Sequence, residues 1–239
     1  MKHLFCAALT LAFATSASAQ YGDISDLKLA KPEDAKDVEK TPAPEGAVVL
    51  FAGDTFENWR KSNGKGDITW NIVDGAMRVT KGGGITSKKK FAGHFHLHVE
   101  FRVPYMPKAS GQGRGNSGVY VQGRYEVQVL DSYGLKSKYN DCGGIYEVAA
   151  PLVNACKAPT VWQSYDIEFW APECDNGKKT SMPKMTVHHN GVKIHDKVEI
   201  NKDNTRAGLG GDVCTPGPIY LQDHGNPVEF RNIWVKQLD

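Results

Sequence analysis

The residues of this sequence best suited to chemistry lie between positions 113 and 131. Four valines alternate there with hydrogen-bonding residues, which are Tyr120, Gln122, Glu126 and Gln128. Period-two alternation is typical of a strand with one buried face. The opposite face lacks the lysines and serines of an ordinary solvated surface. We therefore interpret it as one wall of a cleft that binds a polar ligand.

Two carboxylates and a guanidinium group add reactive chemistry to this stretch. Glu126 and Asp131 could act as a general base and acid, and Arg124, in the turn between the two valine-rich runs, could stabilise a developing negative charge. Asp131 is out of phase with Glu126 unless a bulge shifts the strand, and it could instead cap the turn before Ser132. The alternative interpretation of the whole face is a polar outer surface without a catalytic role.

Further candidates come from distant parts of the chain. Asn116 follows a glycine-rich loop, where its amide could bind a ligand or form an Asx turn. Gln163 opens a predicted strand that could lie beside the first. His224, in the sequence Gln222-Asp223-His224-Gly225 at a predicted strand end, is a candidate base or metal ligand. The remaining histidines in predicted strands, among them His189 and His195, are expected at the surface.

Many short strands must position these residues. Asp74-Gly75 and Asn190-Gly191 each separate two alternating runs, which predicts two β-hairpins. Other strands are predicted at 47–51, 95–103, 162–170, 218–222 and 228–236. No helical periodicity of useful length occurs, so the sequence predicts an all-β sandwich of one domain, residues 46–239.

The N-terminal 45 residues indicate export. Residues 1–19 have the form of a secretory signal, with Lys2, an apolar run and then Ala17-Ser18-Ala19, which predicts a periplasmic or extracellular location. Residues 20–45 are polar, contain three prolines and are predicted to form a tether. The net charge of the 239-residue chain is +2 without a basic tract, so nucleic acid is not expected as a partner. No later segment suits membrane insertion.

Four cysteines follow the predicted signal. Export would place Cys142, Cys156, Cys174 and Cys214 in an oxidising compartment. Of the three possible pairings, we favour a short loop closed by Cys142–Cys156 and a longer one closed by Cys174–Cys214. A metal site is the alternative, although the sequence contains no Cys-x-x-Cys spacing.

The sequence resembles a family of exported bacterial domains, the 3-keto-disaccharide hydrolases. The resemblance covers roughly residues 46–235, and it rests on the order and spacing of several short motifs. The motifs are Val49-Leu50-Phe51 with Asn58-Trp59, Asp74-Gly75, Glu100-Phe101-Arg102, Asn116-Ser117-Gly118-Val119-Tyr120, residues 123–132, Cys142-Gly143-Gly144-Ile145-Tyr146, Trp162-Gln163, Asn190-Gly191-Val192, residues 221–225 and Phe230-Arg231-Asn232-Ile233.

This resemblance implies a concanavalin A-like jelly-roll sandwich of two antiparallel sheets. It also implies activity on 3-keto-glycosides, such as disaccharides in which one ring is oxidised at C3. We expect Glu126, His224 and Arg124 to be catalytic. The positions expected to bind the oxidised sugar are Asn116, Tyr120, Gln122, Gln128, Asp131, Gln163 and Glu100.

The expected chemistry is removal of the acidified C2 proton, elimination of the C1 substituent, and hydration. Glu126 or His224 would be the base, and Arg124 would stabilise negative charge. The sequence specifies no cofactor, and one divalent metal ion held by His224 and a carboxylate is a rival stabiliser. Two other functions stay open, a conventional glycosidase and a non-catalytic carbohydrate-binding module. Gln128 stands where a glycosidase would be expected to carry its second acid.

Overall fold

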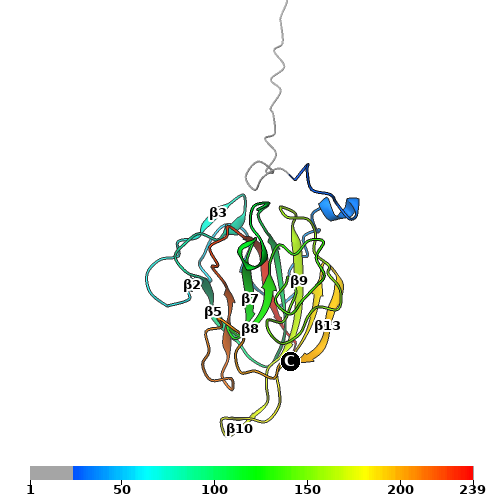
Figure 1. Ribbon diagram of the computed structural model, residues 1–239. Helices are drawn as coiled ribbons and strands as arrows, with labels where there is room; N and C mark the ends of the chain where they lie inside the picture. The colour runs from blue at the N-terminus through cyan, green and yellow to red at the C-terminus, as the bar shows by residue number, and fades with distance from the viewer. Residues whose placement is uncertain (1–23, 239) are drawn as a thin grey trace, which may run out of the picture.

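Two antiparallel β-sheets pack face to face in the computed structural model, which describes residues 24–238 (Figure 1). The chain is a jelly-roll β-sandwich, as predicted. The larger sheet has eight strands in the order β13-β12-β9-β6-β15-β4-β3, with β1 paired to β15. Its strands are β1 (Val48–Phe51), β3 (Asn71–Val73), β4 (Ala76–Arg78), β6 (His94–Arg102), β9 (Gln163–Trp170), β12 (Lys184–His189), β13 (Val192–Glu199) and β15 (Glu229–Gln237).

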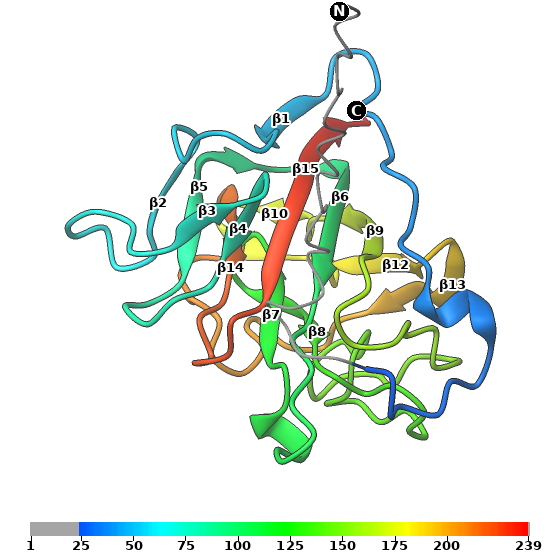
Figure 2. The ribbon, with the colours of Figure 1, turned by 90° about the horizontal axis from the view of Figure 1, so that it is seen from above.

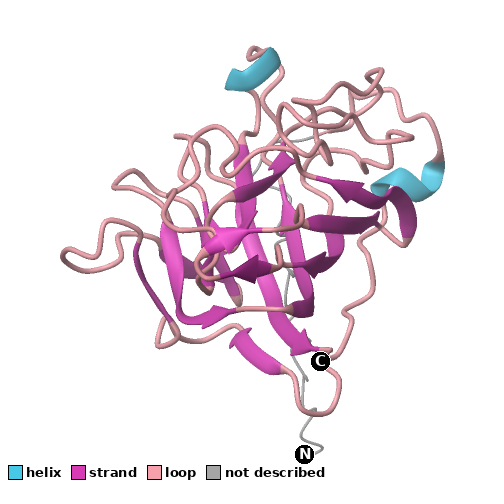
Figure 3. Ribbon diagram, turned by 90° about the horizontal axis from the view of Figure 1, so that it is seen from below, coloured by secondary structure: helices cyan, strands magenta, loops and turns pink. Residues whose placement is uncertain are grey.

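The smaller sheet has five strands in the order β2-β5-β14-β7-β8. They are β2 (Trp59–Lys61), β5 (Ile85–Phe91), β7 (Ser117–Val121), β8 (Tyr125–Val129) and β14 (Gly217–Leu221). A separate two-stranded ribbon joins β10 (Cys174–Asp175) to β11 (Lys178–Lys179). Two 3-10 turns, η2 (Pro32–Ala35) and η3 (Gly111–Gly113), are the helical segments of the described residues (Figure 3). Neither helical segment of this described part is long and apolar enough to cross a bilayer.

Both predicted hairpins form at the predicted turns. Asp74 and Gly75 connect β3 to β4, and Asn190 and Gly191 connect β12 to β13. All four residues have φ between +48° and +80°, and positive φ at both central positions is the requirement of a type I′ turn. Asn, Asp and Gly tolerate that conformation at little cost, which explains why these dipeptides fix the register of both hairpins.

The valine alternation predicts correctly which face of the β7–β8 hairpin is buried in the sandwich. Val119, Val121, Val127 and Val129 are completely buried in the core between the sheets. The ring of Tyr125, on β8, lies 5.6 Å from that of Phe169, on β9 of the other sheet. Tyr120, Glu126 and Gln128, which alternate with these core residues, therefore point away from the larger sheet, on the outer side of the smaller one.

The predicted tether is held against the domain over its described part, residues 24–45. Val38 N donates to Trp162 O, Trp162 N donates to Asp37, and Trp234 Nε1 donates to Thr41 O. Figure 2 shows this segment in blue, passing outside the larger sheet before it enters β1. These contacts use backbone groups, one carboxylate and one indole N–H group, and none of them requires a periodic pattern in the sequence. The predicted signal, residues 1–19, lies outside the described residues.

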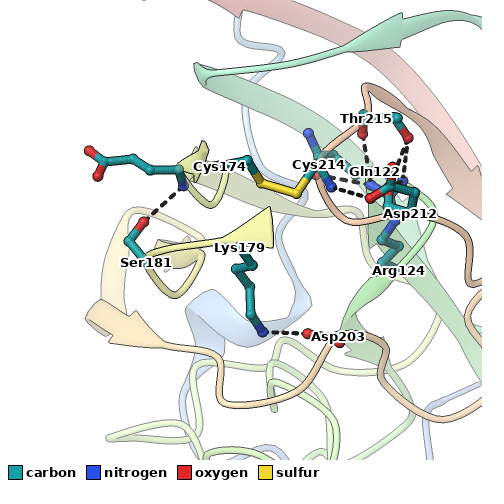
Figure 4. The surroundings of a disulfide bond; sticks show 10 residues. Gln122, Arg124, Cys174, Lys179, Ser181, Asp203, Asp212, Cys214 and Thr215 are labelled. Atoms are coloured by element: carbon teal, nitrogen blue, oxygen red, sulfur yellow. Dashed lines mark hydrogen bonds and ion pairs between the residues drawn. A yellow bond between two sulfur atoms is a disulfide. The ribbon is translucent and has the colours of Figure 1, made fainter. Parts of the chain in front are cut away.

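The structure confirms one predicted disulfide and corrects the other. Cys174 and Cys214 are bonded and connect β10 to the loop before β14, which is consistent with an exported protein (Figure 4). The predicted Cys142–Cys156 bond is wrong in this structure, where both side chains are buried free thiols. Each sulfur instead belongs to a buried cluster, in which Cys142 Sγ lies 3.1 Å from the Tyr165 hydroxyl.

Candidate active site

A polar pocket lies on the outer side of the β7–β8 hairpin. Its volume is about 100 Å³. It is lined by Gln112, Asn116, Tyr120, Glu126, Gln128, Tyr146, Arg206, Ala207, Gln222 and His224. Five predicted site residues therefore meet in one place, which are Asn116, Tyr120, Glu126, Gln128 and His224.

The hairpin register brings the central wall of the pocket together. Tyr120 on β7 is directly opposite Glu126 on β8, and Gly118 is opposite Gln128. The three-residue turn is made by Gln122, Gly123 and Arg124, and the first two have φ of 52° and 68°. Because side chains on one face of a strand recur every second residue, this short turn places Tyr120, Glu126 and Gln128 on the same side.

Glu126 is the chemical centre of the pocket. Its side chain is only 2 % exposed, and burial raises the pKa of its carboxyl to about 8. The Tyr120 hydroxyl lowers this pKa, and the negative charge of Glu147 raises it further. A carboxyl group tuned to this range can exchange a proton near neutral pH, as a general acid or base requires.

Amide groups surround the carboxyl. Gln128 Nε2 lies 2.9 Å from Gln112 Oε1, and in its other amide orientation the nitrogen would lie 3.1 Å from Glu126 Oε1. Asn116 Nδ2 donates to the carbonyl oxygen of Gln112, at 2.7 Å. The Oδ1 atom of Asn116 is buried and has no protein partner. A buried acceptor of this kind is costly unless a ligand hydroxyl or water donates to it.

The rim supplies hydroxyl groups and a cation. Tyr120 O–H donates to Arg206 O at 3.1 Å and accepts from Gln222 Nε2 at 3.0 Å. Burial raises the pKa of Tyr146, and the negative charge of Glu126 raises it further, so this phenol stays protonated. The Arg206 guanidinium is exposed, at 3.5 Å from Glu147. His224 is an exposed side chain at the edge of the pocket.

Arg124, expected to be catalytic, points away from the pocket. It donates to Gln122 Oε1 and Thr215 O, each at 3.2 Å, and to the carbonyl oxygen of Asp212 (Figure 4). These bonds hold the loop that leads to Cys214 against the end of the hairpin. Arg124 is the last residue of the hairpin turn, where its side chain is directed toward that neighbouring loop. The cation that the pocket does contain is Arg206.

Four predicted binding residues also lie outside the pocket. Gln122 Nε2 donates to Phe91 O, and Asp131 Oδ2 lies 3.3 Å from Arg114 Nε. Glu100, on the outer face of the larger sheet, accepts from Arg231 Nε at 2.6 Å. Gln163 begins β9, which pairs with β6 and β12 and not with β7 or β8. The expectation that its strand lies beside the hairpin was therefore wrong.

The pocket is a poor match for a strongly held metal ion. Within residues 24–238, the one group of three His, Cys, Asp or Glu side chains close enough to share an ion is Cys142, Cys156 and His189, outside the pocket. The pocket itself offers Glu126 and His224, together with amide oxygens. A cation there would have two good protein ligands, fewer than the three or more that protein metal sites generally supply.

Sequence analysis missed half of the pocket lining. Gln112 lies in the glycine-rich loop and Tyr146 in the Cys-Gly-Gly-Ile-Tyr motif, but neither belongs to the catalytic and binding residues expected from the sequence. Gln222 is two residues before His224, so its position on a strand end could have indicated it. Arg206 and Ala207 come from a loop without motif or periodicity, and no feature of the sequence points to them.

Comparison with known proteins identifies the family. Residues 46–236 match the model of the 3-keto-alpha-glucoside-1,2-lyase-like domain. The chain belongs to this family. None of the curated proteins compared with the chain matches it.

Solved structures of two candidate glycosyl hydrolases from Parabacteroides distasonis are similar to this chain. The first is 39% identical, with a TM-score of 0.74, and the match covers 82% of this chain and 85% of the other. The second is 20% identical, with a TM-score of 0.63, and covers 84% of this chain and 100% of the other. The first supports a carbohydrate-active enzyme that acts on glycosides, and the second shows a shared fold.

Proposed function

We propose that this protein is exported and cleaves the glycosidic bond of 3-keto-glycosides by elimination across C1 and C2, followed by hydration. The observation that carries this proposal is the buried Glu126 carboxyl, with a pKa raised to about 8, in the wall of a polar pocket. The family description, which names a 1,2-lyase, supports the same reaction type.

The first step is removal of the C2 proton by Glu126. A ketone at C3 acidifies that proton because the resulting carbanion is an enolate. The enolate electron pair then forms the C1=C2 double bond, and the C1–O bond breaks with its electrons on the leaving oxygen. Carboxyl groups of ordinary pKa are weak bases for carbon acids, so the raised pKa of Glu126 favours this step.

Charge and proton balance assign the other roles. Arg206 lies at the pocket rim and would stabilise the enolate oxygen at C3. His224, at the exposed edge, would protonate the leaving oxygen. Water then adds across the double bond: its hydroxide bonds to C1, its proton restores His224, and Glu126, after exchanging its proton with solvent, reprotonates C2. The net result is hydrolysis, without an oxocarbenium ion and without oxidation or reduction.

The pocket chemistry disfavours a conventional glycosidase. That mechanism needs two carboxyl groups, on either side of the scissile bond. Within the described part of the chain, Glu126 is the single acidic residue that lines the pocket. Gln128, two residues further along β8, supplies an amide where a second acid would be needed.

The deciding assay compares a disaccharide with its C3-oxidised form in D2O. The proposal predicts cleavage of the oxidised sugar, with deuterium at C2 of the product beyond that of an enzyme-free control. Cleavage of the unoxidised sugar would establish a conventional glycosidase, and binding without cleavage would establish a carbohydrate-binding module.

Glu126→Gln should abolish turnover, whereas Glu57→Gln is the matched control because Glu57 is exposed and does not line the pocket. Wild-type activity of Glu126→Gln would remove Glu126 from the mechanism. The same assay with a chelator tests the metal alternative. Loss of activity that one divalent ion restores would replace Arg206 by a cation bound to Glu126 and His224.

A further inference from the structure

A buried cluster behind the active-site strand contains two thiols and an imidazole. Cys142 Sγ, Cys156 Sγ and one ring nitrogen of His189 all lie within 4.8 Å of one another. Their residues are 2 %, 8 % and 1 % exposed. We propose that Cys142, Cys156 and His189 form a structural binding site for one zinc ion, separate from the catalytic pocket.

The surroundings of His189 fix which of its atoms can bind the ion. His189 Nε2 lies 3.0 Å from Gln163 Oε1, and the same oxygen accepts from Lys157 N at 2.8 Å. Since Gln163 Oε1 is an acceptor held in place by the backbone, Nε2 carries the proton. Nδ1, which then carries a lone pair, is the ring nitrogen available to the ion. Metal-bound histidines usually donate their other N–H group to a fixed oxygen in this way.

The donor set matches zinc in charge and softness. Two thiolates and a neutral imidazole around one divalent cation give a site with no net charge, which limits the cost of burying it. Zinc prefers sulfur and nitrogen ligands in this combination, whereas calcium and magnesium prefer oxygen. The spacing in sequence, Cys142, Cys156 and His189, lacks a Cys-x-x-Cys motif because three separate segments converge in the fold.

The cluster also has a route to solvent. Cys156 lines a surface pocket of about 540 Å³ that contains Tyr133, Leu135, Asn154 and Asn190. A zinc ion could enter from this side, and the fourth coordination position would face it. Tyr165 does not supply that position, because its hydroxyl donates to Gln128 O at 2.6 Å.

Bound zinc would stabilise the segment that pairs with β8 next to the catalytic pocket. Gly143 N donates to Gln128 O, and Gln128 N donates to Gly144 O, both at 2.9 Å. Cys142 thus begins a short segment that is paired with β8 and ends at Tyr146, a residue of the pocket lining. Fixing Cys142 would limit the motion of both Gln128 and Tyr146.

The test uses the protein freed of bound metal with a chelator, which is then removed by dialysis before titration with Co²⁺, a spectroscopic substitute for Zn²⁺. We expect one equivalent of Co²⁺ to give sulfur-to-cobalt charge-transfer absorption that Zn²⁺ abolishes. At a zinc concentration about 100-fold above Kd, the melting temperature should rise by about 5–10 °C. Neither the cobalt absorption nor the melting temperature depends on enzymatic activity. The zinc site can therefore be disproved while the proposed reaction holds, and the reaction can be disproved while the zinc site holds.

The variant His189→Gln should lose the cobalt signal, and so should Cys156→Ser. His188→Gln is the matched control because this neighbouring side chain is partly exposed and outside the cluster. If a variant fails to fold, peptide mapping of the wild-type protein still shows whether Cys142 and Cys156 are free thiols or a disulfide. A Cys142–Cys156 disulfide in the freshly isolated protein would overturn the proposal, and so would two free thiols that give no cobalt signal.

Discussion

The carboxyl group of Glu126 occupies the space above Gly118, where a Cβ atom would come within 2.3 Å of Glu126 Oε1. Real Cβ atoms essentially never approach another atom that closely. Gly118 lies on β7, across from Gln128, and its missing side chain makes the room in which Glu126 is buried. The raised pKa of the carboxyl therefore depends on a glycine in the neighbouring strand.

Gly118→Ala should displace the Glu126 carboxyl and reduce activity on a 3-keto-glycoside by about 100-fold or more, because misplacement of a catalytic group by about 1 Å costs that much. Overpacking should also destabilise the protein by about 1–3 kcal/mol. Steady-state kinetics and thermal unfolding measure the two effects. Gly113→Ala is the control, since a Cβ at Gly113 would meet nothing within 4 Å. Equal activity of both variants would contradict this role of Gly118.

The pH dependence of kcat/KM should follow the ionisation of Glu126. A base with a pKa of about 8 is mostly protonated at lower pH, so kcat/KM should rise about tenfold per pH unit until it levels off near pH 8. The measurement is the initial rate at low substrate concentration between pH 5 and 9. A kcat/KM that does not rise between pH 5 and 8 would contradict the assignment of Glu126 as the base.

Stability should respond to pH in the opposite sense. The pKa of Glu126 is higher in the folded protein than in the unfolded chain, so the folded state binds more protons between pH 4.5 and about 8. Stability from this group is therefore fully present below pH 4.5 and is lost as the pH rises through about 8. The free energy of unfolding of Glu126→Gln should exceed that of wild type at pH 8 by on the order of a few kcal/mol, but not at pH 4.5. Thermal unfolding at the two pH values checks this, and an equal difference at both would contradict it.

The two arginines should separate catalysis from stability. Arg206→Met should lower kcat by about tenfold or more through loss of enolate stabilisation, with little change in melting temperature because the side chain is exposed. Arg124→Met should remove the guanidinium donor of Thr215 O and one of the donors of Asp212 O, and so destabilise the protein by about 1–3 kcal/mol. Kinetics measured well below the melting temperature distinguish them. The reverse pattern would restore Arg124 as the catalytic cation.

The Cys174–Cys214 disulfide should contribute substantially to stability. It joins residues 40 apart in sequence, and a loop of this length corresponds to roughly 4 kcal/mol in the chain-entropy model. The double variant Cys174→Ser/Cys214→Ser should therefore melt about 5–15 °C lower. This variant is preferable to a reductant, which would also act on Cys142 and Cys156. An unchanged melting temperature would show that Arg124 alone holds this loop.

Local patterns predicted the centre of the site, and long-range packing determined the rest. Tyr120, Glu126 and Gln128 were found because strand alternation is a property of adjacent residues. Arg124 and Gln163 were misplaced because their neighbours come from another loop and another sheet, which no local pattern encodes. His189 and His195 were expected at the surface, but both are buried. Their ring nitrogens lie within hydrogen-bond distance of Gln163 Oε1 and Gly143 O. No sequence pattern indicated Arg206, because its loop is held in place by a long-range contact. The N–H group of Thr205 donates to Arg124 O.

The pocket is built from two kinds of structure with different freedom to change. Glu126 and Tyr120 lie on paired strands, where any shift of register would expose the valine core. Gln112, Tyr146 and Arg206 lie on three separate connections between strands. An engineer could exchange the connections that carry Gln112 and Tyr146 one at a time to select a different leaving group, and would keep the connection that carries Arg206 for its proposed contact with the enolate. The proton transfer proposed for Glu126 would be retained in each new enzyme.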